Sequence, residues 1–257
     1  MKTKSSPIIT LIFFLLIVAC KNPISAQSQN FIKKDSDAKA VRIADEVMKA
    51  GGGNKNWDAT HFIAWNFFGS RTLLWDKYTG NVRIENIKND TRILVNINTL
   101  KGKVFKNGAE LTNQDSLAKY LEEGKNIWIN DSYWLVMPFK MKDPGVTLKY
   151  ISEDTTLKGD KADVVRLTYK GVGVTPNNAF NVWVNKKTRL VDQWAFYQEA
   201  NQPKPNFVLS WEDYRVFGKI KLSGTRGDRK ITDIHVYNYV PDSVFNSFAP
   251  YDVNEFK

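Results

Sequence analysis

Cysteine is nearly absent from this chain: among 257 residues there is one, Cys20. A single thiol excludes an intramolecular disulfide, so disulfide cross-links contribute nothing to stability. Histidine is almost as rare, since His61 and His235 are the only two. A tetrahedral zinc site takes three or four Cys, His or carboxylate ligands, and no spacing in the chain suggests one. The sequence therefore predicts neither a metal nor any other cofactor.

Signatures of catalysis are missing as well. There is no Gly-x-Ser-x-Gly elbow for a serine nucleophile. The run Gly171–Pro176 superficially resembles a phosphate-binding loop, but it lacks the lysine and the helix that such a loop requires. Strand carboxylates such as Asp192, Glu212 and Asp213 leave a glycan hydrolase open as a less favoured alternative, because pairing across strands cannot be read from sequence. We predict that the protein is not an enzyme.

No apolar run is long enough to cross a bilayer. Pro7–Ala19 is uncharged and follows Lys2 and Lys4, which is typical of a signal peptide, but it falls short of the ~20 residues of a spanning helix. The next residues, Ile17-Val18-Ala19-Cys20, resemble the lipobox of bacterial lipoproteins, in which the cysteine is acylated and becomes the new N-terminus. Residues 1–19 are thus predicted to be a lipoprotein signal peptide, with Cys20 as the lipid anchor.

The residues around this anchor set the predicted location. Lys21 and Asn22 lack the acidic run that resembles a surface-export signal, which favours an outer-membrane lipoprotein facing the periplasm. The alternative is ordinary cleavage after Ala26, which would discard Cys20 and release a soluble periplasmic protein.

The chain also lacks a basic cluster, although its formal net charge is +10. Lys and Arg are spread along the chain, and the densest group, Arg226–Lys230, includes an acid and is typical of a hairpin turn. We interpret most of this charge as a solvated face and exclude nucleic acid as a partner. The predicted membrane contact is the N-terminal lipid.

Most of the chain shows the alternation of apolar and polar residues that is typical of strands, and two segments show helical spacing instead. Asp37–Ala50 carries apolar residues at helical spacing, and Gly51-Gly52-Gly53 ends it. A second helical patch spans Asn113–Lys125, followed by a turn and a buried helical turn or strand within Ile127–Phe139. About twelve strands are expected at His61–Phe68, Arg71–Lys77, Asn81–Ile87, Thr91–Asn98, Lys103–Lys106, Val146–Ser152, Ala162–Tyr169, Phe180–Asn185, Leu190–Glu199, Phe207–Val216, Lys219–Thr225 and Ile231–Val240.

These elements predict the fold and its domains. The breaks between strands are too short for crossover helices, so the sheet is antiparallel. Several strands are apolar on one face and mixed on the other, as in one sheet curved around a filling. We predict a mainly β (α+β) protein: a single open, strongly curved antiparallel barrel of 11–12 strands, its concave side plugged by helices. Residues 20–35 are the predicted flexible linker, and 36–257 the domain.

Five segments together resemble a group of uncharacterised exported proteins of Bacteroidetes-type bacteria, which is itself similar to the LolA/LolB-like superfamily of lipoprotein carriers and receptors. The segments are Ala50-Gly51-Gly52 with Trp57 and Phe62, Trp75–Gly80, Asn130–Leu135, Asp143–Val146 with Leu148-Lys149-Tyr150, and Val172–Pro176. The resemblance implies an open curved barrel of about eleven strands, with helices at its mouth and an apolar cavity for acyl chains. It does not by itself imply the function, because one fold serves many uses.

The resemblance, together with the one-sided apolar strands, implies an apolar cavity that holds the acyl chains of a lipid or lipoprotein, and strand parity selects its lining residues. Its predicted lining is Ile93, Val95, Leu148, Leu167, Val182, Trp194, Leu209 and Trp211 on strands, closed by Trp128, Trp134 and Met137 from the helical insertion. The alternative is an envelope structural or interaction module whose interior is filled by its own side chains. The domain is expected to be a monomer.

Overall fold

The computed structural model describes residues 31–171 and 175–257. The predicted signal peptide, Cys20, the alternative cleavage site after Ala26 and most of the predicted linker lie outside the described residues. So does the middle of the glycine-rich run, residues 172–174. None of the described helices is both long and apolar enough to cross a membrane.

The helical elements are few. They are η1 (Lys33–Asp35), α1 (Ala38–Ala50), α2 (Asn54–Ala59), α3 (Gln114–Val136), η2 (Met137–Phe139), α4 (Ser243–Asn246) and η3 (Val253–Glu255). The predicted first helix is confirmed as α1, which buries Ala40, Ile43, Ala44 and Val47. No side chain caps its start, because the carboxylate of the N-cap residue, Asp37, instead accepts from Lys149 Nζ and the Tyr150 amide, both at 3.0 Å.

The strands are β1 (Phe62–Phe67), β2 (Arg71–Asp76), β3 (Asn81–Asn86), β4 (Thr91–Asn96), β5 (Gly102–Lys106), β6 (Ala109–Glu110), β7 (Val146–Thr155), β8 (Lys161–Tyr169), β9 (Ala179–Asn185), β10 (Val191–Tyr197), β11 (Phe207–Ser210), β12 (Glu212–Phe217), β13 (Ile220–Arg226) and β14 (Arg229–Tyr237). They form a nine-stranded sheet in the order β12-β13-β14-β1-β2-β3-β4-β5-β6 and a five-stranded sheet in the order β11-β10-β9-β8-β7. Every pair is antiparallel, and β14 with β1 is the pair that joins strands far apart in sequence.

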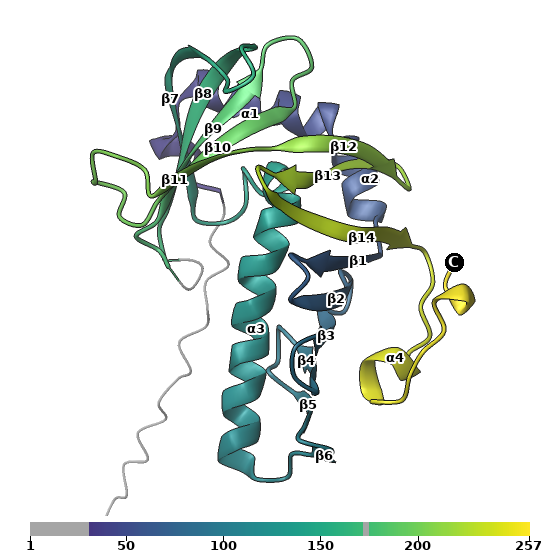
Figure 1. Ribbon diagram of the computed structural model, residues 1–257. Coiled ribbons are helices and arrows are strands. Elements are labelled where there is room, and N and C mark those ends of the chain that lie inside the picture. Colours follow the sequence, from purple (N-terminus) through teal and green to yellow (C-terminus); the bar gives the residue numbers. More distant parts are fainter. Residues whose placement is uncertain (1–30, 172–174) are drawn as a thin grey trace, which may run out of the picture.

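The two sheets are joined at Trp211. This residue separates β11 from β12 by one position, is 1% exposed, and donates its amide to the Asp192 carbonyl at 2.8 Å. The chain therefore leaves the smaller sheet and enters the larger one where the sequence predicted a single strand, Phe207–Val216. The predicted fold class is confirmed: the protein is mainly antiparallel β, with open sheets and a central helix (Figure 1). The described chain has fourteen strand segments where 11–12 were predicted.

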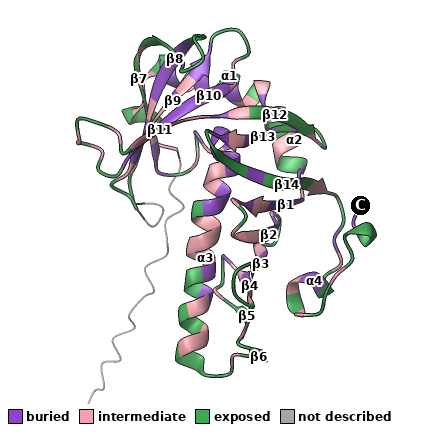
Figure 2. Ribbon diagram, in the orientation of Figure 1, coloured by how far each residue is buried: buried purple, intermediate pink, exposed green. Residues whose placement is uncertain are grey.

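The central helix α3 is one continuous helix of 23 residues, not a helix, a turn and a second element. Asn113 caps its start, since its Oδ1 accepts the Ser116 amide at 2.9 Å. The helix continues through Gly124, which is buried against β4. A Cβ at this position would lie 2.8 Å from Ile93 Cγ2. The glycine thus permits a close approach between helix and sheet. Residues at the beginning of α3 are largely exposed, and those at its end are buried or half-buried (Figure 2).

Two apolar cores lie on either side of the C-terminal half of α3. One packs this helix on the larger sheet, through residues such as Leu121 and Leu135 with Ile93 and Val95. The other packs α1 and Met137 on the smaller sheet. Trp134 contacts both, so the C-terminal end of α3 lies where the two sheets meet.

The chain before α1 lies against the edge of β7. Ile32 donates its amide to the Val146 carbonyl at 3.2 Å, and Asp37 donates to the Leu148 carbonyl at 2.9 Å. Phe31 packs on the core of the smaller sheet. The last residues of the predicted flexible linker are therefore attached to the domain, because they occupy hydrogen-bonding groups that an edge strand would otherwise leave open.

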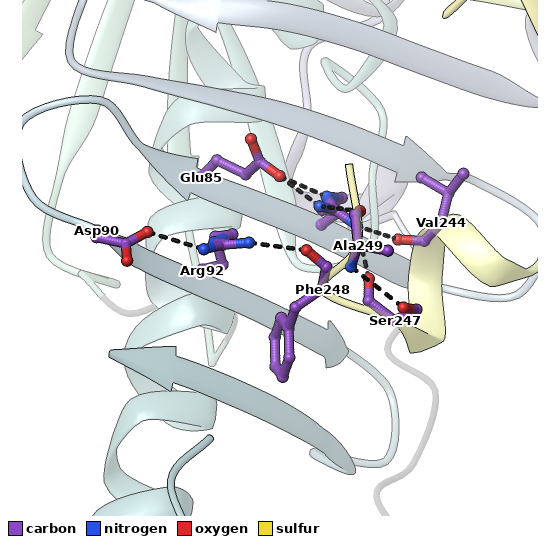
Figure 3. Close-up of polar contacts among 8 residues, drawn as sticks. Glu85, Asp90, Arg92, Val244, Ser247, Phe248 and Ala249 are labelled. Carbon is purple, nitrogen blue, oxygen red and sulfur yellow. Dashed lines mark hydrogen bonds and ion pairs between the residues drawn. The ribbon is translucent and has the colours of Figure 1, made fainter. Parts of the chain in front are cut away.

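The C-terminal segment after β14, residues 240–257, covers the other face of β1–β4. Arg83 is 2% exposed and donates to the carbonyls of Val244 at 2.9 Å and Ser247 at 2.7 Å. Arg92 donates to the Phe248 carbonyl at 2.7 Å, and Figure 3 shows this contact beside Glu85, Ser247 and Ala249. The two arginines thus hold the segment through its main-chain carbonyls, and its Val240, Val244 and Phe256 also pack in one apolar cluster with Phe62 and Leu74.

Candidate binding site: an aromatic seam beside the central helix

The predicted lining residues do not form one open cavity wall. Ile93, Val95 and Trp128 belong to the core between α3 and the larger sheet, whereas the other predicted residues pack in or against the core of the smaller sheet; these are Trp134, Met137, Leu148, Leu167, Val182, Trp194, Leu209 and Trp211. Two surface hollows over the described residues have volumes of about 150 and 370 Å³, and of the predicted set only Ile93 lines either. The structure thus brings most of these side chains together by packing them on one another.

Around Trp134 of α3, a row of half-buried aromatic rings reaches the surface. The rings are Phe68, Trp134, Phe207 and Phe196, with successive centroids 5.2, 5.6 and 5.1 Å apart. We call this row the aromatic seam. It draws on the β1–β2 turn, α3, β11 and β10, so no short sequence motif could reveal it.

Fully buried rings lie beneath the seam. Trp194 contacts Trp134 edge-on at 4.7 Å, and it contacts Trp211 at 5.0 Å in the same manner. Phe180 stacks on Trp194 at 5.0 Å. Offset and edge-to-face pairs contribute roughly 0.5–1.5 kcal/mol each beyond the burial of their area. The seam is therefore the exposed border of a continuous aromatic cluster.

The first ring of the seam is held in a strained backbone conformation. Phe68 has φ = +53°, in the left-handed region that bulky side chains rarely adopt. Its ring meets Trp134 edge-on, and the Arg229 guanidinium lies 5.8 Å from its centroid. Strain of this kind costs of order 1–3 kcal/mol and persists where surrounding contacts enforce it.

At the base of the cluster lies Arg226, which the sequence analysis assigned to a solvated turn. That interpretation is wrong for this residue: Arg226 is 0% exposed, and its guanidinium carbon lies 3.3 Å from the centroid of the Trp211 ring. Its side chain donates to the Trp134 carbonyl at 2.6 Å, to the Thr225 carbonyl at 2.7 Å, and to both the hydroxyl and the carbonyl of Ser223, at 2.8 and 3.1 Å. Desolvation lowers the pKa of Arg226 to about 9, so it carries its charge at neutral pH.

Two further polar contacts attach the same end of α3 to the sheets. Asp131 is fully buried and accepts from Arg71 at 2.5 and 2.9 Å. Burial raises the pKa of the Asp131 carboxyl, in spite of the Arg71 contact that acts to lower it. The hydroxyls of Tyr133 and Tyr169 also bond to one another. Together with Arg226, these contacts join α3 to β2, β8 and β13.

Several buried N–H donors in this region have no partner among the described residues. Three are the indole Nε1 atoms of Trp194 and Trp211 and the Nε of Arg226. Three more, near the larger sheet, are the indole Nε1 atoms of Trp65, Trp75 and Trp128. Most buried polar groups in native proteins are hydrogen-bonded, so such a concentration calls for an explanation. Within the described part of the chain, Arg189 Nε is a further unpartnered donor, and Asn126 Oδ1 on α3 is an unpartnered acceptor. Oxygen acceptors on a ligand would match the donors.

The two histidines lie apart from the seam. His61 Nε2 is 3.1 Å from Asp76 Oδ1, and its ring stacks on Phe62 and Tyr78. His235 shares the larger surface hollow with Asp233, which has φ = +50° at an irregularity in the β1–β14 pairing. No group of three or more His, Cys, Asp or Glu side chains among the described residues is placed to hold a metal ion.

Comparison with known proteins gives little beyond this geometry. No family model matches the chain, and no curated protein matches it. Among solved structures it is similar to a DUF1329 family protein from Desulfovibrio piger, with 11% identity, over 80% of this chain and 97% of that chain, at a TM-score of 0.44. A likeness at this level carries no argument about function, and membership of the LolA/LolB-like superfamily stays a prediction.

Proposed function

We propose that this chain is a non-enzymatic, exported protein that binds an acyl chain of a lipid or lipoprotein along the aromatic seam, between α3 and the smaller sheet. The observation that carries the proposal is the seam itself: four half-buried aromatic rings from separate elements, continuous with a buried aromatic cluster. Small-molecule sites are lined mainly by hydrophobic and aromatic side chains with a few polar groups.

The attachment of α3 supports this proposal. The space beside the helix is filled in the structure, so an acyl chain enters only if the C-terminal end of α3 shifts. Hydrogen bonds to charged groups contribute only about 1.5–3 kcal/mol each, since water replaces the lost partner once the site opens. The contacts of Arg226 and Asp131 with this end are of that kind, and the unpartnered donors around them offer sites for ligand oxygens.

Anchoring by Cys20 at the periplasmic face of the outer membrane is part of the proposal. Multiple acyl chains on one cysteine give stable membrane attachment, because each buried methylene contributes about 0.8 kcal/mol. Intact mass of the protein from the membrane fraction, compared with Cys20→Ala, tests this step. A chain that begins at Gln27 without acyl mass would replace the anchored form by a soluble periplasmic one.

The binding proposal is tested on the protein purified without delipidation. We expect organic-solvent extraction and mass spectrometry to find an acyl lipid with the wild type and clearly less with Trp134→Ala. Trp183→Ala is the matched control: Trp183 is a half-buried tryptophan on β9 that packs in a separate apolar cluster. Absence of lipid from the wild type, or equal loss in the two variants, would contradict acyl binding at the seam.

A second candidate function is an envelope interaction module with a self-filled interior. It is favoured by the packing of the predicted lining residues on one another. In that case no lipid is extracted, and cross-linking in intact cells captures the same envelope protein with wild type and with Trp134→Ala. The two outcomes separate the candidates.

A further inference from the structure

We propose that Arg226 is the head-group receptor of the seam, and that the ligand it selects is a single-chain amphiphile with a carboxylate head, a long-chain fatty carboxylate. The inference rests on the proposed acyl binding and specifies its ligand. The carboxylate lies at Arg226, at the base of the cluster, and the chain runs outward along Trp134, Phe207 and Phe196.

The first argument is charge. Arg226 makes no ion pair with any described residue, and each of its partners is a neutral carbonyl or hydroxyl oxygen. A buried cation is costly unless it is paired with an anion. Arg71 also contacts α3, but it forms an ion pair with the Asp131 carboxylate. The unpaired charge at Arg226 therefore favours an anionic ligand over a neutral one.

The second argument is the remaining hydrogen-bonding capacity. A guanidinium has five N–H donors, and the contacts of Nη1 and Nη2 with Ser223, Thr225 and Trp134 occupy four. The fifth, on Nε, has no partner among the described residues, and neither has the indole N–H of Trp211 or of Trp194. A carboxylate is an acceptor-only group, so its oxygens can accept from these three unpartnered donors.

The third argument is the placement of Arg226 relative to the seam. Its guanidinium donates to the backbone carbonyl of Trp134, whose ring is the centre of the row. The hairpin that carries it is fastened to β11, because the Gly227 amide donates to Ser210 Oγ at 3.0 Å. The exposed Arg229, 5.9 Å from the Trp134 ring, adds a second positive charge at the surface. The charged head of a linear amphiphile would thus contact a cation, and its chain would contact the apolar rings next to that cation.

The test compares two probes that differ only in the head: cis-parinaric acid and its methyl ester, titrated into the full chain with energy transfer from tryptophan as the readout. We expect the wild type to bind the acid about tenfold or more tightly than the ester, as for a charge-assisted hydrogen bond. Arg226→Met is expected to lose this preference and to bind acid and ester with similar affinity, even if the loss of its contact with the Trp134 carbonyl changes the affinity for both probes. Arg226→Lys, which keeps the charge, is expected to retain part of it.

Arg215→Met is the control, since the Arg215 side chain is 69% exposed and pairs with Asp213; it should leave both affinities unchanged. Equal binding of acid and ester by the wild type would overturn the head-group assignment and leave acyl binding standing, with no variant needed. So would an equal loss of both probes in a folded Arg226→Met. If neither probe binds the wild type, the proposed function itself fails, and the head-group receptor with it.

Discussion

The contact between α3 and β4 at Gly124 gives a prediction whose sign can be worked out from the structure. Replacing an interior helical glycine by alanine ordinarily stabilises a helix by about 0.8–1 kcal/mol. Here the new methyl group would lie 2.8 Å from Ile93 Cγ2 and 3.3 Å from Val95 Cγ1. Both neighbours are buried side chains on β4, so the helix or the strand must shift. Such overpacking typically costs about 1–3 kcal/mol.

Gly124→Ala is therefore expected to lower the free energy of unfolding by about 0–2 kcal/mol, because the overpacking offsets the gain in propensity. Ile93→Ala removes the clashing methyl and costs about 2–5 kcal/mol alone. In that background Gly124→Ala should become stabilising, and the double-mutant cycle should show a favourable coupling of about 1–3 kcal/mol. Urea unfolding followed by circular dichroism measures all four free energies.

Ala118→Gly is the control for propensity, since Ala118 is exposed on the same helix. It should destabilise by about 1 kcal/mol without coupling to Ile93. If Gly124→Ala instead stabilises the wild type by the full propensity difference, with no coupling to Ile93→Ala, then α3 does not pack against β4 at this residue. The position of the central helix would then be wrong.

Three further predictions concern polar contacts. Asp131→Asn leaves Arg71 without its carboxylate, and we expect a loss of stability near the lower end of about 3–5 kcal/mol, since Arg71 is partly exposed; urea unfolding with no loss would contradict the ion pair. Arg83→Leu should increase hydrogen exchange across residues 240–257 tenfold or more, because each hydrogen bond to a charged group contributes about 1.5–3 kcal/mol; unchanged exchange would show that the segment is held otherwise. Contacts with Lys149 and the Tyr150 amide lower the pKa of the Asp37 carboxyl below 3.8. The stability that its ionised form contributes is therefore complete above pH 3.8, and it is lost as the pH falls through the lowered pKa. A carboxyl titration by NMR at or above 3.8 would refute it.

The sequence predicted what depends on local pattern. Apolar residues at helical spacing located α1. Alternation and turn residues located nearly all the strands, because a strand with one buried face must alternate and a tight turn needs residues such as Asn-Gly. The second helix was predicted to end at Lys125, whereas α3 continues to Val136, because nothing local shows that Gly124 serves close packing on β4. The division of Phe207–Val216 at Trp211 was also missed, because both halves keep strand alternation while the pairing partner changes.

The candidate site could be predicted only in part. Trp134, Trp194 and Trp211 were found by their size and strand or helix position, and the structure places them in contact. Phe68, Phe196 and Phe207 were not, because their role depends on elements that meet only in the folded chain. Arg226 sits in a polar hairpin sequence, and nothing local distinguishes its buried side chain from that of the exposed Arg229, its partner across the hairpin.

The pairing of β14 with β1 has a consequence for how the chain folds. Every other strand pair forms between neighbours in the sequence and can assemble as each hairpin is completed, whereas Phe62 must wait for Tyr237. Closing so long a loop is slow, and an unpaired edge is prone to pair with other chains in the meantime. During synthesis the edge of β1 stays open until almost the whole chain has been made. A truncation before β14 would therefore leave a permanent open edge and would be expected to aggregate.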